Sequence, residues 1–360
     1  MPTSTNSSRD GPGVGAAGEP YLPPAERDEL LRDLEKCDEE MQQARKGDQD
    51  KDRELLLISL ERGLHLRRRL YAESSPEVTS ACRRLCEACN FAATRMLQTD
   101  NVKGAFDLLK RAEQVADKSD VDRAITWNNM AVYYRRAGKL RTAVTFLERA
   151  LVIEEHLGTA NVAQTHLNLC ATLSQLQRHT DALLHAQTAL IRIYETLSPA
   201  MINGELAHVG GSFSSGTPHS EQDEEEEEAE DGGEGLQEQV SVLCIAYHNL
   251  AVEHEYLKRF DAALCAYASG MRWANRFLSS NHTLREILRE SAETVKAKLP
   301  RGSGALKRAD ELSAGFPSTA SRRGSAPSEG GSTDLHGLMA PRGGDASAEA
   351  DIHDDEDRDN

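Results

Sequence analysis

The fold of this chain is decided by residues 124–157, which read AITWNNMAVYYRRAGKLRTAVTFLERALVIEEHL. In each half of this stretch, apolar residues recur at helical spacing, which places them on one face of a helix. They are Trp127, Met130, Ala131 and Tyr134 in the first half, and Ala143, Leu147 and Ala150 in the second. Gly138 lies between the halves, and glycine readily adopts the left-handed conformation that ends a helix. The stretch therefore predicts two helices joined by a tight turn.

The same stretch resembles the tetratricopeptide repeat (TPR), a hairpin of two antiparallel helices. That repeat has a large residue at position 4, a small one at 8, an aromatic at 11 and alanines at 20 and 27. Counted from Ala124, these positions hold Trp127, Ala131, Tyr134, Ala143 and Ala150. The resemblance implies an all-α fold, an α-solenoid in which hairpins stack because each pair leaves apolar surface uncovered.

Three further repeats of this type begin at Cys86, Ala163 and Cys244. Their apolar residues fall at the same repeat positions: Cys89, Ala92, Ala93, Met96, Ala105, Leu109 and Ala112; Leu169, Leu173, Ala182, Ala186 and Ala189; and Tyr247, Leu250, Ala251, Ala263 and Tyr267. Upstream, Leu30, Leu34, Cys37 and Met41 predict one helix, and Leu56, Leu60, Gly63 and Leu64 a second. An amphipathic helix over 281–299 suits a cap at the end of the stack.

Composition divides the chain into five segments. They are a disordered N-terminal segment (1–22), TPR-like helical repeats (23–200), a disordered acidic insertion (201–239), a last repeat with a capping helix (240–299) and a disordered acidic C-terminal tail (300–360). Residues 219–238 hold eleven acidic residues and no Lys or Arg, and 345–360 hold eight with one Arg. The net charge of −17 is therefore regional. Because the folded part has no excess of basic charge, we expect no nucleic acid partner.

The sequence shows no signal for secretion or membrane insertion. Residues 1–20 contain no apolar leader, and no run of about 18 apolar residues occurs. An odd number of cysteines, seven, fits a reducing compartment better than a disulfide framework. We expect a cytoplasmic protein, with the cytoskeleton and the cilium or flagellum left open as sites.

Two segments also resemble the longer repeats of kinesin light chains. They are residues 60–71, followed by Ser75-Pro76-Glu77-Val78, and residues 147–158, followed by residues 162–168. The acidic insertion and the lack of a long heptad segment depart from that family. The resemblance implies a groove for peptides and leaves a motor partner open.

In the TPR family, positions 2, 5, 6, 9, 12 and 13 of each first helix face the concave groove. From these positions we select the polar candidates Asn90, Asn128, Asn129, Arg135, Arg136, Asn168, Gln175, His248 and Asn249. A side-chain amide both donates and accepts hydrogen bonds, so a row of amides can hold the backbone of an extended peptide. Arg135 or Arg136 would add an anchor for an acidic residue. The alternative is that each asparagine bonds a neighbouring helix.

Cysteines at positions 82, 86 and 89 have the spacing of some iron–sulfur sites. The same spacing lies on one helical face, and Cys89 is core position 4, so buried thiols are the better interpretation. We expect no metal, no cofactor and no catalysis. Ser325 follows Arg322-Arg323-Gly324 and is a candidate phosphorylation site, although such motifs also arise by chance. The acidic run 224–228 is interpreted as a solvated spacer. The alternative is that this run, or the acidic tail 354–357, folds back onto Arg135 and Arg136.

These observations favour a non-enzymatic adaptor or scaffold that binds a protein or peptide ligand in the concave groove of a TPR solenoid. The alternative is an architectural subunit of a cytoskeletal or ciliary or flagellar assembly, with permanent contacts on the convex face. The sequence leaves the oligomeric state open.

Overall fold

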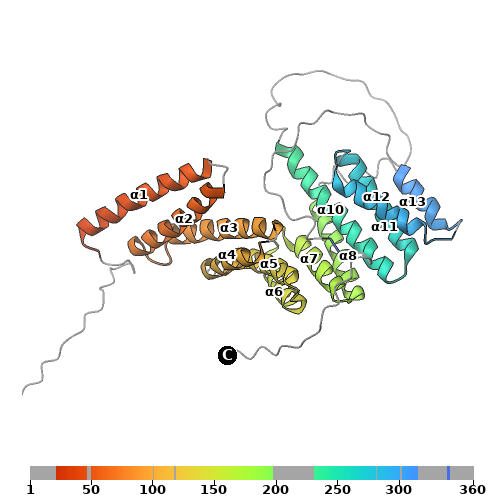
Figure 1. The fold of residues 1–360 in the computed structure, drawn as a ribbon, viewed down its shortest axis with the longest axis horizontal. Helices are drawn as coiled ribbons and strands as arrows, with labels where there is room; N and C mark the ends of the chain where they lie inside the picture. The colour runs from red at the N-terminus through yellow and green to blue at the C-terminus, as the bar shows by residue number, and fades with distance from the viewer. Residues whose placement is uncertain are drawn as a thin grey trace, which may run out of the picture. The chain divides into compact units, whose positions relative to one another are not determined.

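A computed structural model describes residues 22–46, 50–99, 101–116, 119–197, 231–280, 282–300, 302–314 and 339–340. Within these ranges the chain forms twelve helices and no strand, which confirms the all-α fold (Figure 1). The helices are α1 (Pro24–Lys46), α2 (Asp50–Leu70), α3 (Pro76–Gln98), α4 (Val102–Val115), α5 (Asp120–Arg136), α6 (Leu140–Leu157), α7 (Val162–Gln175), α8 (His179–Thr196), α10 (Asp231–Tyr256), α11 (Phe260–Phe277), α12 (Thr283–Lys296) and α13 (Gly304–Ala314). In the described part of the chain, no helix has both the length and the hydrophobicity needed to cross a bilayer.

The helices form two compact units, residues 1–133 and residues 134–360. In unit 1, α1 pairs with α2, α3 pairs with α4, and α2 packs against α3. The first pair buries a cluster made of Leu30, Leu34, Cys37, Leu66 and Leu70. Helix α3 begins at Pro76, after Ser75 accepts a hydrogen bond from the backbone N–H of Val78 at 3.2 Å. This cap satisfies one of the N–H groups that a helix start leaves open.

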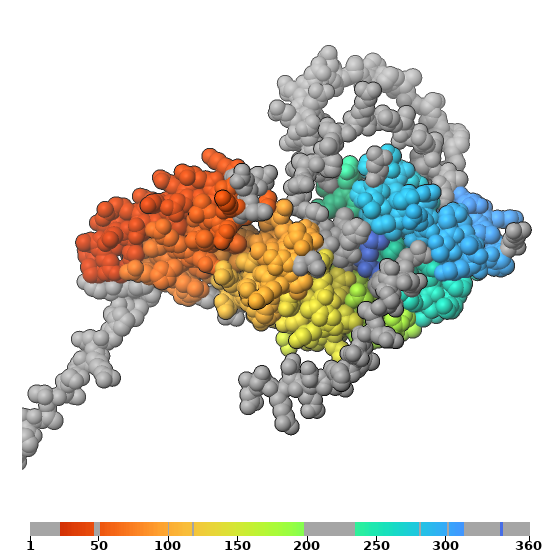
Figure 2. All heavy atoms as spheres, viewed as in Figure 1, coloured from red at the N-terminus to blue at the C-terminus, as the bar shows by residue number. Residues whose placement is uncertain are grey.

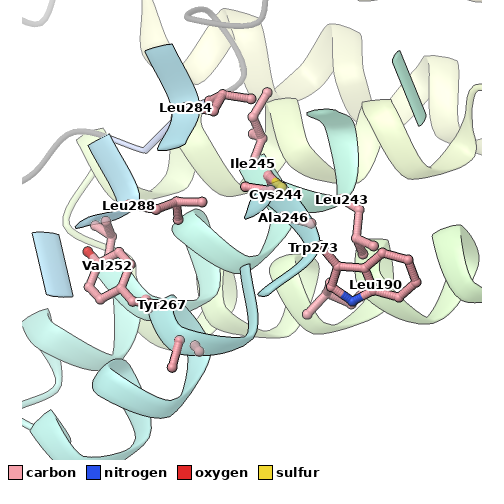
Figure 3. Close-up of a cluster of buried hydrophobic side chains, with 14 of the residues drawn as sticks. Leu190, Leu243, Cys244, Ile245, Ala246, Val252, Tyr267, Trp273, Leu284 and Leu288 are labelled. Atoms are coloured by element: carbon pink, nitrogen blue, oxygen red, sulfur yellow. The ribbon is translucent and has the colours of Figure 1, made fainter. Parts of the chain in front are cut away.

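Unit 2 is a chain of helix contacts that runs from α6 to α7, α8, α10 and α11, with α12 and α13 packed on α11. Its core draws residues from every helix from α7 to α13. Figure 3 shows Leu284 of α12 pointing toward Ile245 of α10, and Trp273 of α11 beside Leu190 of α8. The amphipathic helix predicted at 281–299 is α12, and it buries Leu284, Leu288 and Val295.

Helices α8 and α10 pack together although residues 198–230 separate them in sequence. A chain of hydrogen bonds crosses this contact. The hydroxyl oxygens of Tyr194 and Tyr247 lie 2.7 Å apart, and Nε1 of Trp273 donates to the Tyr194 hydroxyl at 3.1 Å. The predicted insertion therefore falls between helices that remain neighbours.

The hairpin turns share one backbone geometry at repeat position 15. Gly138, Gln177 and Lys258 occupy this position with φ of 76°, 61° and 59°. In each turn the residue after it donates a backbone hydrogen bond five residues back, from Lys139 to Tyr134, from Arg178 to Leu173 and from Arg259 to His254. A bond of this type with a left-handed residue is the Schellman motif, which ends a helix and reverses the chain.

Two elements extend beyond the boundaries expected from composition. Helix α13 (Gly304–Ala314) lies in the segment 300–360, for which disorder was predicted, and it packs against α11. Helix α10 begins at Asp231, inside the predicted insertion 201–239. The other segments for which disorder or modification was expected lie outside the described residues. They include residues 1–21, 224–228 and 354–357, and Ser325.

Candidate functional site

The nine polar residues selected from the sequence lie on the first helices of their hairpins. Asn90 is on α3, four are on α5, Asn168 and Gln175 are on α7, and the last two are on α10. Burial divides them into three groups: Asn90, Asn128, Asn168, His248 and Asn249 are buried, Asn129 and Arg135 are half-buried, and Arg136 and Gln175 are exposed.

In unit 1, two of the predicted amides bind each other and a neighbouring helix. Asn129 Nδ2 donates to Asn90 Oδ1 at 3.0 Å, and Asn90 Nδ2 donates to the Thr126 hydroxyl at 2.9 Å. That hydroxyl in turn donates to the carbonyl of Asp122 at 2.8 Å. Asn90 thus joins α3 to α5, which agrees with the alternative that these asparagines bond a neighbouring helix.

In unit 2, Asn249 binds the backbone of a distant segment of the chain. Its Oδ1 accepts a hydrogen bond from the backbone N–H of Ala340 at 2.7 Å. Asn249 is completely buried and Ala340 is 3% exposed. Met339 packs against the core of the unit. Figure 2 shows these two residues in dark blue.

Helix α7 is buried along most of its length, from Thr165 to Ser174. It contacts α6, α8 and α10, so its predicted groove residue Asn168 lies in an interior environment, whereas Gln175 at its end is exposed. Its buried residues include the polar side chains of Thr165, His166, Asn168, Thr172 and Ser174.

Sequence reasoning missed a buried carboxylate next to α7. Glu253 of α10 is completely buried, and its Oε2 lies 2.8 Å from Nδ1 of His179 at the start of α8. The His179 ring stacks on Tyr256 with centroids 4.0 Å apart. Burial raises the pKa of Glu253, and the contact with His179 opposes that rise. Glu253 and His179 are 74 residues apart, so no local pattern connects them.

A pair of histidines was also missed. Nδ1 of His166 on α7 lies 2.8 Å from Nδ1 of His185 on α8. Burial, helped by His185 and Arg192, lowers the pKa of His166 to about 4. Both rings therefore remain neutral in the folded unit near pH 7, and one nitrogen donates to the other.

The cysteine triplet lies on α3 as helical spacing predicts. Cys86 and Cys89 are buried, and burial raises their thiol pKa values to about 11 and about 12. Cys82 is half-buried, 3.9 Å from Nη2 of Arg68. Thiols in such surroundings behave as small apolar residues. Among the described residues, no three His, Cys, Asp or Glu side chains are arranged to hold a metal.

The small residues of the four hairpins identify the repeat type. Their positions 8, 20 and 27 are all buried: Ala93, Ala105 and Ala112; Ala131, Ala143 and Ala150; Cys170, Ala182 and Ala189; Ala251, Ala263 and Gly270. A Cβ on Gly270 would lie 3.1 Å from Cβ of Tyr247, which explains why the last position holds glycine. The described helix pairs are therefore TPR-like hairpins.

Solved structures of TPR-like repeats are similar to this one. Nearly identical repeats named for kinesin light chain, from Podosopora anserina, share 13% identity and a TM-score of 0.38, covering 75% of this chain and 99% of that one. BtubC (BKLC) from P. vanneervenii shares 16% identity and a TM-score of 0.46, covering 78% and 99%. A Rap protein complexed with Competence and Sporulation Factor shares 12% identity and a TM-score of 0.43, covering 80% and 77%. No protein-family model and no curated protein matches the sequence.

Proposed function

We propose that this TPR-type protein is a non-enzymatic adaptor or scaffold that binds an extended peptide or helix through the first helices of its repeats. The observation that carries the proposal is the bond from Ala340 to Asn249. It supports the view that an amide at repeat position 6 can hold a backbone N–H that belongs to no neighbouring helix. Such a bond recognises a main chain whatever side chains it carries.

Charged and amide groups near the ends of two first helices extend this surface within unit 2. Arg135 is half-buried and Arg136 is exposed in the last turn of α5, and Gln175 is exposed at the end of α7. A guanidinium binds a carboxylate through two parallel hydrogen bonds, so we expect an acidic residue in the partner to favour binding.

The test is a binding assay with immobilised peptide arrays of extended sequences, probed with the full chain. Asn129, Asn168 and Asn249 changed together to Ala should lower binding by tenfold or more. Because Asn168 and Asn249 are buried, a surface variant, Arg136→Glu with Gln175→Ala, provides a second probe that leaves the core unchanged. Glu148→Ala, on the exposed side of α6, is the matched control. Equal binding by all four chains would contradict the proposal.

A specific surface supports the architectural alternative. Leu184 and Ile191 of α8 lie seven residues apart and are 62% and 59% exposed, so they share one face of a second helix. If this face makes permanent contacts, the full chain should self-associate or precipitate when produced without partners. Leu184→Glu with Ile191→Glu should then restore a monomer in sedimentation velocity, whereas a wild-type monomer would argue against this role.

A further inference from the structure

Two residues from the C-terminal part of the chain are placed inside unit 2. Residues 315–338 separate them from α13, and Ala340 lies 91 residues from its partner Asn249. Ala340 belongs to the buried core of the unit, and Met339 packs against that core. A segment that belongs to no helix therefore occupies a position predicted to receive a foreign peptide.

The contact defines a chemical preference. The main-chain N–H of Ala340 donates to Oδ1 of Asn249 at 2.7 Å, and Asn249 is completely buried. The Ala340 side chain is a single methyl group and the residue is 3% exposed, so a larger side chain would require neighbouring atoms to move. The preceding Met339 adds flexible apolar contact. The following Pro341 has no N–H group.

We propose that the Met339–Ala340 segment is an internal ligand of unit 2 and that the external partner is a peptide of the same kind. That peptide carries a large apolar residue followed by Ala or Gly, and Asn249 holds the N–H of the small residue. This inference rests on the proposed function, because it assigns a ligand class to the same surface. The internal segment and the external peptide then exclude one another.

The linked segment competes at high effective concentration. A segment on the same chain acts as if present at roughly millimolar concentration, so it weakens an external peptide of about 100 μM affinity by roughly tenfold. Releasing the segment should therefore restore the tenfold loss in peptide affinity without any new contact.

The experiment uses the full chain with one substitution in the segment. Ala340→Pro removes the donor N–H, whereas Ala340→Gly keeps it and serves as the matched control. The probe is a fluorescent peptide of residues 334–345, and its binding is followed by anisotropy. We expect the peptide to bind the Ala340→Pro chain about tenfold more tightly than the wild type, and the Ala340→Gly chain to stay within about threefold of the wild type. The same peptide carrying the Pro substitution should not bind.

Two outcomes overturn the inference. One is that the peptide binds wild-type and Ala340→Pro chains equally, or binds neither, while circular dichroism shows both to be folded. The other is that the Pro-substituted peptide binds as well as the original. A parallel array of unrelated extended peptides separates the two proposals. Binding there that depends on Asn249, without binding of the 334–345 peptide, rejects the internal ligand alone. If neither the array peptides nor the 334–345 peptide bind the wild-type or the Ala340→Pro chain, the proposed function is rejected as well.

Discussion

Nδ1 of His179 lies 2.8 Å from Oε2 of Glu253, and the carboxylate is completely buried. The contact joins the start of α8 to α10 within unit 2, where the two helices also pack through their apolar residues. A buried carboxylate is tolerated when hydrogen bonds replace the water that it has lost. The pair is therefore expected to make the stability of the unit depend on pH.

Glu253→Gln should reduce this pH dependence. Burial raises the pKa of Glu253 above 4.5, so the folded state keeps a proton that the unfolded chain has already released. Stability from this group is then present below pH 4.5 and is lost as pH rises through the folded pKa. In urea unfolding between pH 4.5 and 7, the wild type should lose stability relative to the variant as pH rises. Glu148→Gln, at an exposed site on α6, should change stability by less than about 0.5 kcal/mol. A pH-independent difference would contradict this.

His166→Gln should have an effect of opposite sign. The pKa of His166 is lowered from 6.5 to about 4, so the unfolded chain takes up a proton that the folded chain refuses. Stability from this group is present above pH 6.5 and is lost as pH falls toward 4. At about 1.4 kcal/mol per pKa unit, the wild type should lose up to roughly 3 kcal/mol over that range relative to the variant. His156→Gln, at an exposed site on α6, is the control. Parallel unfolding curves at pH 7.5 and 4.5 would reject the assignment.

The left-handed turn residues give a prediction with two signs. Gly138→Ala should destabilise the chain, because an L-residue in this conformation is penalised by roughly 1–2 kcal/mol. Lys258→Gly should relieve that strain. Glycine also makes the unfolded chain more flexible, which offsets part of the benefit, so a net gain in stability of about 0.5–1 kcal/mol is expected. Both positions have positive φ in equivalent turns. Thermal unfolding of both full chains measures the changes, and shifts of equal sign would contradict the shared geometry.

Ala182→Leu should destabilise the stack by overpacking. Ala182 occupies repeat position 20 and is completely buried. Extra methylene groups at such a site force neighbouring side chains out of place, at a cost of about 1–3 kcal/mol. Gln187→Leu, on the exposed side of the same helix, is the matched control and should change stability by less than about 0.5 kcal/mol. If both leucines are tolerated equally, close approach of the helices at position 20 is excluded.

Asn90→Ala should destabilise unit 1, because the Asn90 side chain bonds Cys86, Thr126 and Asn129. Its loss removes the bonds to Cys86, Thr126 and Asn129 and leaves the buried Thr126 hydroxyl with one partner fewer, so a cost of about 1–3 kcal/mol is expected. Asn129→Ala removes one bond from a half-buried site and should cost less. In a double-mutant cycle the two changes should couple by about 0.5–1.5 kcal/mol. Strict additivity would show that the amide–amide bond contributes nothing.

The architecture of the hairpins was predictable because it depends on local periodicity. Ala131, Ala143 and Ala150 recur at helical spacing, and each is buried in the structure. Gly138 marks the turn for the same reason, since glycine is the natural residue at positive φ. Gln177 and Lys258 take the same conformation without glycine, so the turn follows from the hairpin geometry and not from one residue type.

The candidate site was less predictable because its contacts connect distant residues. The bond from Ala340 to Asn249 and the contact of His179 with Glu253 span 91 and 74 residues. Reasoning from composition over 300–360 also overlooked α13, although Ala305 and Ala309 lie one helical turn apart and are both buried. A search for short apolar spacing within the tail would have found that helix.

The contact between α8 and α10 has a practical consequence for building fusions and split versions of this protein. Tyr194 of α8 bonds both Tyr247 of α10 and Trp273 of α11, so hydrogen bonds connect the helices on either side of residues 198–230. A reporter domain grafted into that interval, or a chain divided there and expressed as two polypeptides, would leave this hydrogen-bonded joint intact. Burial of the apolar residues that α8 shares with α10 and α11, together with these hydrogen bonds, would then drive reassembly of the halves without a peptide linkage between them.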